Sequence, residues 1–328
     1  MKKNRFEGSR VGHADGVSRK NEGKQLGTIE WGFDDISDWG RGPHRARHRL
    51  HEHPAFQPGA LADLLDRVPR DIVHPYTMGS DPARTDQWRR GEVTHLSGAQ
   101  LLEVVERGRL WLNIVDVGTH DPTIADLTRG LYAEITDLAP GFAPTSVKAT
   151  LLIASPTAQV YYHADNQPNA LWHLRGSKRL FVYPKGQRFI TDEQLERIVA
   201  GVADEQLPYR PELDQHATVM DLEPGDVAWW PQNSPHRVVN LAGLNVSLST
   251  EHRTAASTRR ERITASNHAL RRGMPALPPS STDRGLATSG KIALGRVLRR
   301  AIRRTGAPGP PPTFEIDPSC DGGVRLTS

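Results

Sequence analysis

Cysteine, aromatic residues and long apolar runs are all scarce in this chain of 328 residues. The single cysteine, Cys320, excludes an intramolecular disulfide framework and a zinc site built from several thiolates. No run of 18 or more apolar residues occurs, so no transmembrane helix is expected. The basic N-terminus lacks the apolar stretch that a secretory signal requires. These absences predict a cytoplasmic protein without a membrane-spanning segment.

Excess positive charge is confined to the two ends of the chain. Residues 1–26 carry seven Lys and Arg against three Asp and Glu, and residues 254–328 carry thirteen against five. Residues 27–253 carry 22 against 30 and are therefore acidic, although the whole chain has a net charge of +4. Any attraction to nucleic acid or to an anionic membrane is expected to be a property of the ends.

Composition divides the chain into three parts. Residues 1–26 have almost no large apolar residues and are predicted to form a disordered basic tail. Residues 27–253 are predicted to form the folded domain. Residues 254–328 form a basic, Pro-containing extension with an amphipathic helix near 291–304. That helix is compatible with docking on its own domain, with a homodimer, and with contact to a partner, nucleic acid or anionic membrane, and its pattern leaves these alternatives open.

The central part combines a few helical segments with many short strands. Helical spacing predicts helices at 58–68, after Ser97 and at 121–138, and strands are expected at 110–117 and 146–155. Residues 191–206 are predicted to form a helix or a loop inserted between strands. Short strands separated by turns then recur to about residue 250, which favours an antiparallel barrel over alternating βαβ units. The predicted fold class is mainly β, a double-stranded β-helix (jelly-roll or cupin) barrel with flanking α-helices and basic tails. Four histidines between residues 44 and 53 are interpreted as part of a solvated polar segment rather than as a metal site.

Three candidate metal ligands come from two segments of the predicted β domain that are far apart in the sequence. His163 and Asp165 are two positions apart in a strand-like segment, so both side chains can reach one point inside a barrel. His236, much later in the chain, can complete the set. Two imidazoles and one carboxylate are typical of Fe(II) sites with open coordination positions, with Mn(II) and Co(II) as competing ions. The His-x-Asp pattern alone is weak in a chain with 14 histidines, since a single histidine is more simply a hydrogen-bonded core or surface residue.

Polar residues around this pattern suggest a second ligand. Lys178 opens an otherwise apolar strand and would need an anionic partner if it pointed inward. The far carboxylate of 2-oxoglutarate is such an anion, whereas outward placement would make Lys178 an ordinary solvated lysine. Asn169 lies between the ligands and the turn, where its amide can donate to the same cosubstrate. Ser249 lies on a polar face of the segment 245–249, which lines a wet pocket or faces water at a sheet edge.

Read together, the motifs HAD, Asn169, GSKR and FVYP, followed by PGDVAWWP and PHRVVN, resemble the JmjC and cupin-like Fe(II)/2-oxoglutarate dioxygenases. Within that family the chain is most similar to the asparaginyl-hydroxylase-type branch, over roughly residues 27–253. The resemblance implies that iron is bound by His163, Asp165 and His236. It also implies that Lys178 binds the far carboxylate of 2-oxoglutarate and that Asn169 and Ser249 contact the same cosubstrate.

Two positions depart from the family pattern. Val160 stands where relatives often carry a threonine, three residues before the first histidine. The upstream strand often supplies a tyrosine to the cosubstrate, and here Asn113 or Thr150 would have to serve instead. Both departures concern cosubstrate binding and leave the predicted iron site intact.

The resemblance implies an enzyme that uses Fe(II), 2-oxoglutarate and O2 and gives succinate and carbon dioxide as coproducts. It would hydroxylate, or demethylate, a peptide, protein or small-molecule substrate. One alternative is a non-catalytic metal- or ligand-binding cupin that acts as a regulatory or interaction module, and another is a different cupin enzyme such as a metal-dependent isomerase. The intact ligand set with Lys178 favours the oxygenase. Deletion of residues 287–328 is expected to leave uncoupled turnover intact.

Overall fold

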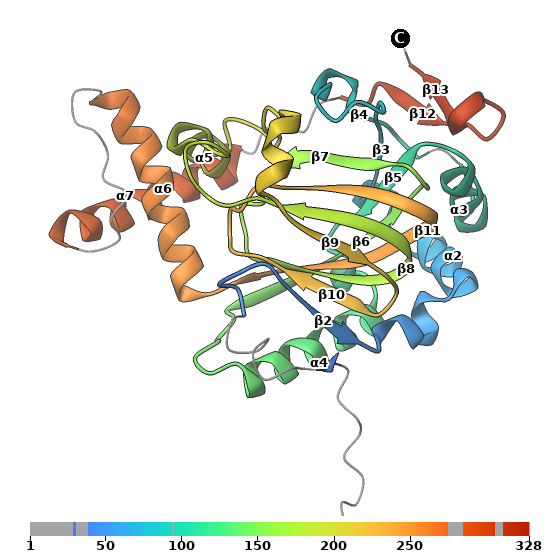
Figure 1. Ribbon diagram of the computed structural model, residues 1–328, viewed down its shortest axis with the longest axis horizontal. Coiled ribbons are helices and arrows are strands. Elements are labelled where there is room, and N and C mark those ends of the chain that lie inside the picture. Colours follow the sequence, from blue (N-terminus) through green and yellow to red (C-terminus); the bar gives the residue numbers. More distant parts are fainter. Residues whose placement is uncertain (1–28, 31–38, 94, 275–284, 306–310, 328) are drawn as a thin grey trace, which may run out of the picture.

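The computed structural model describes residues 29–30, 39–93, 95–274, 285–305 and 311–327. The tail predicted at 1–26 therefore lies outside the described residues. At the centre is a sheet of eleven strands that folds back on itself (Figure 1). No helix in the described ranges is both long and apolar enough to cross a membrane.

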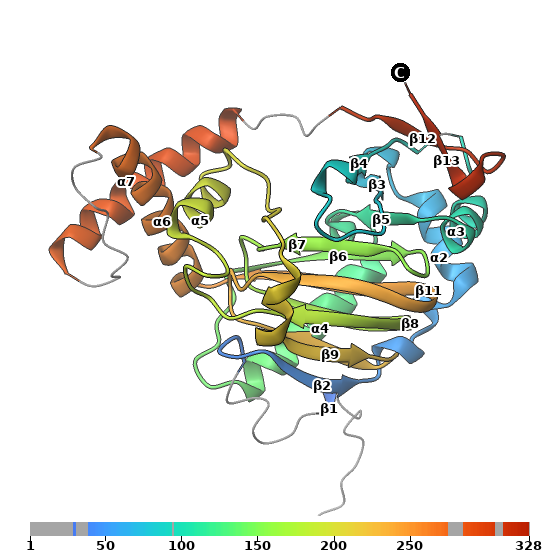
Figure 2. The same cartoon turned by 45° about the horizontal axis from the view of Figure 1, so that its top comes forward.

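Two long strands, β8 (Asn169–Val182) and β11 (His236–Arg253), organise this sheet. They pair antiparallel with each other along most of their lengths, with register shifts between Asn240 and Ser247. Gly176 and Gly243 lie at this corner with φ of 76° and 67°. A Cβ on Gly176 would lie 2.8 Å from the carbonyl oxygen of Leu244, so glycine is the residue that fits there without strain. The ribbon turns at this point, and each long strand contributes one half to each of two layers (Figure 2).

The larger layer contains the first half of β8, the second half of β11 and seven shorter strands. These are β1 (Ile29–Glu30), β2 (His44–His48), β3 (Val73–Thr77), β4 (Arg89–Arg90), β5 (Leu110–Ile114), β6 (Ser146–Ala154) and β10 (Asp226–Trp229). In the smaller layer, β7 (Gln159–His163) and β9 (Thr218–Leu222) flank the other halves of β8 and β11. Two layers joined by shared long strands form the double-stranded β-helix, so the predicted jelly-roll fold class is confirmed.

Three helices cover the outer face of the larger layer. They are α2 (Pro58–Arg67), α3 (Gly98–Arg107) and α4 (Pro122–Leu138). Their buried leucine and isoleucine side chains share one apolar core with the outward side chains of β5, β6 and the second half of β11. All three helices confirm the sequence prediction, since their apolar residues recur at helical spacing and Ser97 caps α3 with a capping box.

Three further helices lie together at the opposite end of the molecule (Figure 1). They are α5 (Asp192–Val199), α6 (Ala255–Gly273) and α7 (Leu286–Thr305). The hydroxyl of Ser266 on α6 donates to the carbonyl of Lys291 on α7 at 2.6 Å, and Gly295 lies directly against the backbone of Arg262. Among the alternatives left open for the predicted helix at 291–304, docking on its own chain is therefore the one that the structure contains.

The histidine run at 44–53 is not a solvated polar segment, which corrects the sequence prediction. It contains β2, which pairs with β10 at the edge of the larger layer. Ala46 and His48 point inward while Arg45 and Arg47 point outward, as strand alternation requires. The ring of buried His48 accepts a hydrogen bond from the backbone N–H of Leu50 at 3.0 Å. Arginines at every second position concealed this inward face in the sequence.

A hairpin near the C-terminal end packs on the main body. It consists of β12 (Phe314–Ile316) and β13 (Val324–Leu326). Phe314 and Ile316 are buried in the main apolar core, and the backbone N–H of Glu92 donates to the carbonyl of Phe314 at 2.9 Å. Removal of a buried phenylalanine typically costs about 3–5 kcal/mol. The expectation that residues 287–328 can be deleted without loss is therefore revised, because that deletion removes core side chains.

Candidate active site

A cavity of about 410 Å³ lies between the two layers of the jelly roll. One side is lined from β5, β6 and the second half of β11, and the other from β7, the second half of β8 and the first half of β11. All eight site residues singled out in the sequence line this cavity: Asn113, Thr150, His163, Asp165, Asn169, Lys178, His236 and Ser249. The fold therefore brings together residues that are up to 136 positions apart in the chain.

The three candidate metal ligands converge at one end of the cavity. His163 ends β7 and His236 begins β11, and the two residues face each other in the strand pair. The carboxylate of Asp165 lies 3.5 Å from Nε2 of His163 and 3.3 Å from Nε2 of His236. The ligand atoms all lie within 4.8 Å of one another, and this is the one His/Cys/Asp/Glu group of such geometry among the described residues. Three donors at this spacing can hold one metal ion.

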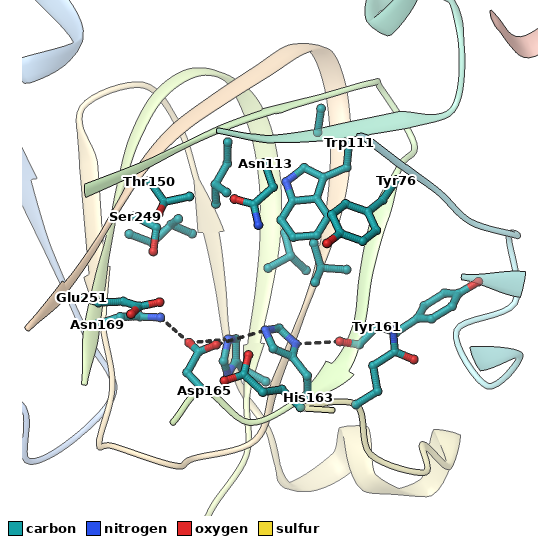
Figure 3. A pocket seen from close by; sticks show the side chains of 18 of the residues that line it. Tyr76, Trp111, Asn113, Thr150, Tyr161, His163, Asp165, Asn169, Ser249 and Glu251 are labelled. Atoms are coloured by element: carbon teal, nitrogen blue, oxygen red, sulfur yellow. Dashed lines mark hydrogen bonds and ion pairs between the residues drawn. The ribbon is translucent and has the colours of Figure 1, made fainter. Parts of the chain in front are cut away.

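Backbone carbonyls fix the orientation of both imidazoles. Nδ1 of His163 lies 2.8 Å from the carbonyl oxygen of Tyr161 (Figure 3). Nδ1 of His236 lies 3.1 Å from the carbonyl oxygen of Ser234. Because a carbonyl only accepts, each Nδ1 carries a proton, and each Nε2 faces Asp165 as the ring nitrogen that could bind a metal ion. Metal-binding histidines in proteins are usually held in this way. The sequence did not identify these two partners.

The charge state of Asp165 also suits a metal ligand. Burial alone would raise the pKa of its carboxyl, but the neighbouring imidazoles of His236 and His163 outweigh burial and lower that pKa. Asp165 is therefore ionised at neutral pH. An anionic oxygen beside two imidazole nitrogens, without thiolate, is the donor chemistry that Fe(II) and similar divalent ions accept.

Asn169 contacts the metal-binding end of the cavity. Its side-chain N–H donates to the carboxylate of Asp165, as Figure 3 shows. Its amide oxygen is buried and has no hydrogen-bond donor within the described ranges. In this structure the side chain therefore holds a ligand carboxylate, and the predicted contact with a cosubstrate stays a prediction.

Lys178 points into the cavity and is buried rather than solvated. Its residue exposure is 4%, and it makes no hydrogen bond or ion pair with any residue that the structure describes. Burial lowers the pKa of its ammonium group to about 7. Asn240, its partner across the β8–β11 pair, also lines the cavity and has a buried amide oxygen without a donor. An unpaired buried ammonium of this kind calls for an anionic ligand.

The opposite side of the cavity carries Asn113, Thr150 and Ser249 (Figure 3). The hydroxyl of Thr150 already accepts a hydrogen bond from the backbone N–H of Asp116 at 3.3 Å. The amide oxygen of Asn113 is buried without a partner in the described part of the chain. Of the predicted polar face at 245–249, only Ser249 reaches the cavity, because Ser247 is hydrogen-bonded to the ring of His173 at 3.0 Å.

Acidic residues that the sequence reasoning missed, together with several aromatic residues, complete the lining. Glu251 follows Ser249 on the same face of β11, a spacing that could have identified it, and burial together with the charge of Asp165 raises the pKa of Glu251 to about 7. Asp204 and Glu205 belong to an irregular segment after α5 that gave no signal. The aromatic lining comprises Tyr76, Trp88, Trp111, Tyr161 and Trp230.

No model of a known protein family and no curated protein sequence matches the chain. Crystal structures of YcfD from Escherichia coli are similar with a TM-score of 0.49 and 17% identity, over 84% of this chain and 69% of that one. A structure of the same protein, described as a ribosomal oxygenase in complex with cobalt and 2-oxoglutarate, has a TM-score of 0.49 and 16% identity, over 85% and 69%. The DMSP lyase DddQ from Ruegeria pomeroyi is similar over 35% of this chain and 42% of that one, with a TM-score of 0.23 and 13% identity. At such identities the likeness concerns the fold alone.

Proposed function

We propose that this protein is an Fe(II)- and 2-oxoglutarate-dependent oxygenase that hydroxylates, or demethylates, a peptide, protein or small-molecule substrate. One observation carries the proposal. A group of two imidazoles and one carboxylate, open on one side, shares its cavity with a buried lysine that has no partner among the described residues. A metal site alone would explain the two imidazoles and the carboxylate. The buried ammonium of Lys178 would need an additional, anionic ligand.

The donor set fits the proposed metal. His163 and His236 would each supply Nε2, because their Nδ1 atoms are bound to backbone carbonyls. Asp165 would supply an ionised oxygen, held in place by Asn169. Three protein ligands leave the remaining positions of a six-coordinate ion free for cosubstrate and oxygen.

Bound Fe(II) would couple the activation of oxygen to the oxidative decarboxylation of 2-oxoglutarate. Succinate and carbon dioxide would be the coproducts. The chain contributes binding, orientation and exclusion of water. Lys178 would hold the far carboxylate by a charge-assisted hydrogen bond, which strengthens in a site of low dielectric. Apolar lining residues, among them Val160, Leu171 and Val238, would keep water from the space between Lys178 and the metal ligands.

The proposal is tested by measuring succinate formation from 2-oxoglutarate with Fe(II) and ascorbate. We expect metal-dependent turnover for the native protein and a decrease of at least ~100-fold for His163→Ala, since loss of a ligand should exceed the ~10–100-fold typical of a residue that only supports one. Binding of Mn(II), followed by calorimetry, should weaken in parallel. His120→Ala, an exposed histidine outside the cavity, is the matched control.

Two outcomes would count against the proposal. Metal-loaded native protein without any succinate formation would favour the non-catalytic cupin. Equal turnover by the native protein and His163→Ala would contradict the assignment of the metal ligands.

A further inference from the structure

We propose that Asn233 and Gln232 are positioning residues of the candidate metal site. Their side-chain amides tie the segment that contains Asp165 to the turn that orients His236, and so fix the spacing between these two ligands. The inference rests on the proposed function, because it takes the group of His163, Asp165 and His236 as a metal site. It adds two residues that neither bind the metal nor line the cavity.

Asp165 is the one of the three candidate ligands that lies outside a strand. His163 ends β7 and His236 begins β11, and these two residues pair with each other. Asp165 belongs to the segment 164–168, which connects β7 to the start of β8. Its carboxylate accepts a hydrogen bond from Asn169, but its backbone lies beyond the end of the strand pairing. The position of this ligand therefore depends on other contacts.

Two buried amide side chains supply such contacts. Nδ2 of Asn233 donates to the backbone carbonyl oxygen of Asp165 at 2.8 Å. Nε2 of Gln232 donates to the backbone carbonyl oxygen of Asn166 at 3.0 Å. Asn233 and Gln232 are only 4% and 5% exposed, so water competes little for these hydrogen bonds. Because a carbonyl that loses its donor away from bulk water is unfavourable, removal of either amide should let the segment move.

The turn that contains both amides also orients His236. Residues 231–234 form a tight turn, which a backbone hydrogen bond of 3.0 Å between its first and last residues closes. The carbonyl oxygen of Ser234 accepts from Nδ1 of His236 at 3.1 Å. One turn is thus hydrogen-bonded to two ligands from distant segments. The carboxylate of Asp165 lies 3.3 Å from Nε2 of His236, so a displaced turn would change that spacing directly.

The backbone of Asn233 shows what the asparagine adds to this turn. Its φ is 63°, in the left-handed region. Glycine adopts that region without strain, and asparagine is one of the few other residues that visit it. Glycine would satisfy the turn but would supply no amide. Asn233→Gly therefore removes the hydrogen bond to Asp165 while it keeps the backbone conformation.

A weaker contact continues from the turn to α6. Nη1 of Arg260 donates to the amide oxygen of Gln232 at 3.2 Å. Arg260 is exposed, so water can replace this donor. The effect of a substitution on metal affinity should therefore decrease with distance from Asp165, in the order Asn233, Gln232 and Arg260.

The test compares Asn233→Gly, Gln232→Met and Arg260→Met with the control Asn245→Ala, all in the full-length protein. Asn245 is buried, donates to two backbone carbonyls at 3.0 and 3.3 Å, and does not line the cavity. Calorimetry measures Mn(II) affinity, and the electron paramagnetic resonance spectrum of bound Mn(II) reports the geometry of its ligands. The melting temperature without metal measures stability. These readouts do not depend on turnover, whereas the proposed function is tested by succinate formation.

We expect Asn233→Gly to weaken Mn(II) binding by about tenfold, the lower end of the range for residues that support a ligand. The spectrum of bound Mn(II) should change with it. Gln232→Met should weaken binding severalfold and Arg260→Met by less than about twofold. Asn245→Ala should lower the melting temperature but keep the native Mn(II) affinity and spectrum, because its hydrogen bonds act on stability alone.

Native Mn(II) affinity and a native spectrum in Asn233→Gly would overturn the inference. An equal loss of affinity in Asn245→Ala would do the same, since affinity would then follow stability rather than contact with Asp165. Native protein that binds Mn(II) but forms no succinate would contradict the proposed function alone. Native protein that does not bind Mn(II) would overturn both.

Discussion

The two layers that enclose the cavity place their functional side chains in different ways. In the smaller layer, each imidazole of the candidate metal site is oriented by a carbonyl only two residues earlier in the chain, Tyr161 for His163 and Ser234 for His236. In the larger layer, Asn113, Thr150, Ser249 and Glu251 meet only because β5, β6 and β11 pair in one register.

The two layers thus differ in whether a side chain is positioned by its neighbours in the chain or by the pairing of distant strands. A ligand held by its own neighbours keeps its geometry wherever the strand lies, whereas a side chain placed by register depends on the pairing of distant strands. The candidate metal ligands should therefore tolerate changes in the larger layer, except at Asn169, which belongs to the first half of β8 and donates to Asp165. Cosubstrate affinity should respond to changes on both sides. The following substitutions examine that separation, beginning with the largest expected effect.

Lys178→Met should weaken 2-oxoglutarate binding by roughly 10–100-fold, because a charge-assisted hydrogen bond contributes about 1.5–3 kcal/mol. Affinity for Mn(II) should stay within about twofold, since Lys178 touches no metal ligand. Calorimetric titration of each ligand measures both effects. Lys178→Arg, which keeps the charge with a different shape, should lie between the native protein and Lys178→Met. Unchanged cosubstrate affinity in Lys178→Met would contradict the assigned role.

Asn169→Ala should reduce metal affinity by about tenfold, as is typical when the hydrogen-bond partner of a ligand is removed. Ser249→Ala, on the same layer but without a contact to Asp165, is the matched control and should leave Mn(II) binding unchanged. Equal loss of metal affinity in both variants would show that the loss does not come from the hydrogen bond between Asn169 and Asp165.

The affinity for 2-oxoglutarate should fall as the pH rises above 7. Burial lowers the pKa of Lys178 in the empty site to about 7, so at higher pH the ammonium must regain a proton before it can pair with the incoming carboxylate. A single group with that pKa predicts a decrease of about fivefold between pH 7 and pH 8. Titrations at both pH values test this, and Lys178→Arg, which remains protonated, should show a flat profile. A flat profile in the native protein would show that Lys178 stays charged without a ligand.

Val160→Thr should have the smallest effect, a gain of about two- to fivefold in affinity for 2-oxoglutarate. Val160 lines the cavity on β7, and one added neutral hydrogen bond at the lower end of the usual range contributes about 0.5–1 kcal/mol. The KM for 2-oxoglutarate reports the change. Val160→Ala provides a size control, and an equal gain from that variant would mean that space rather than hydrogen bonding limits binding.

Sequence reasoning was most successful where the cause is local. The helices α2, α3 and α4 follow from apolar spacing and caps. The His-x-Asp pair was predicted from alternation within one strand, but β7 ends at His163 and Asp165 lies just beyond it. Lys178 was identifiable because a charge on an apolar strand needs an explanation. The roles proposed for these residues remain predictions until the experiments above are done.

Features that depend on the pairing of distant segments could not be predicted from the sequence. Glu205 lies beside the metal ligands only because its segment extends the pairing of β7, and Phe314 is buried only because its hairpin returns to β4 and Gly91. His48 was hidden for a similar reason, since the arginines that alternate with it suggest solvent. A single residue whose position depends on a tertiary contact leaves no periodic pattern in the sequence.

The uninterrupted register between His236 and Lys178 has a further consequence, for the size of ligand that the barrel accepts. His236 pairs with Val182 and Asn240 pairs with Lys178, so the lysine is anchored four residues along the ribbon from a metal ligand. At roughly 3.3 Å per residue this is about 13 Å of backbone, part of which the lysine side chain spans. The remaining distance between the ammonium of Lys178 and the candidate metal ligands is set by hydrogen-bonded strands rather than by flexible side chains. Under the proposed function, the barrel would discriminate between dicarboxylates by chain length, because a diacid that is too short could not reach the ammonium of Lys178 and the metal at the same time.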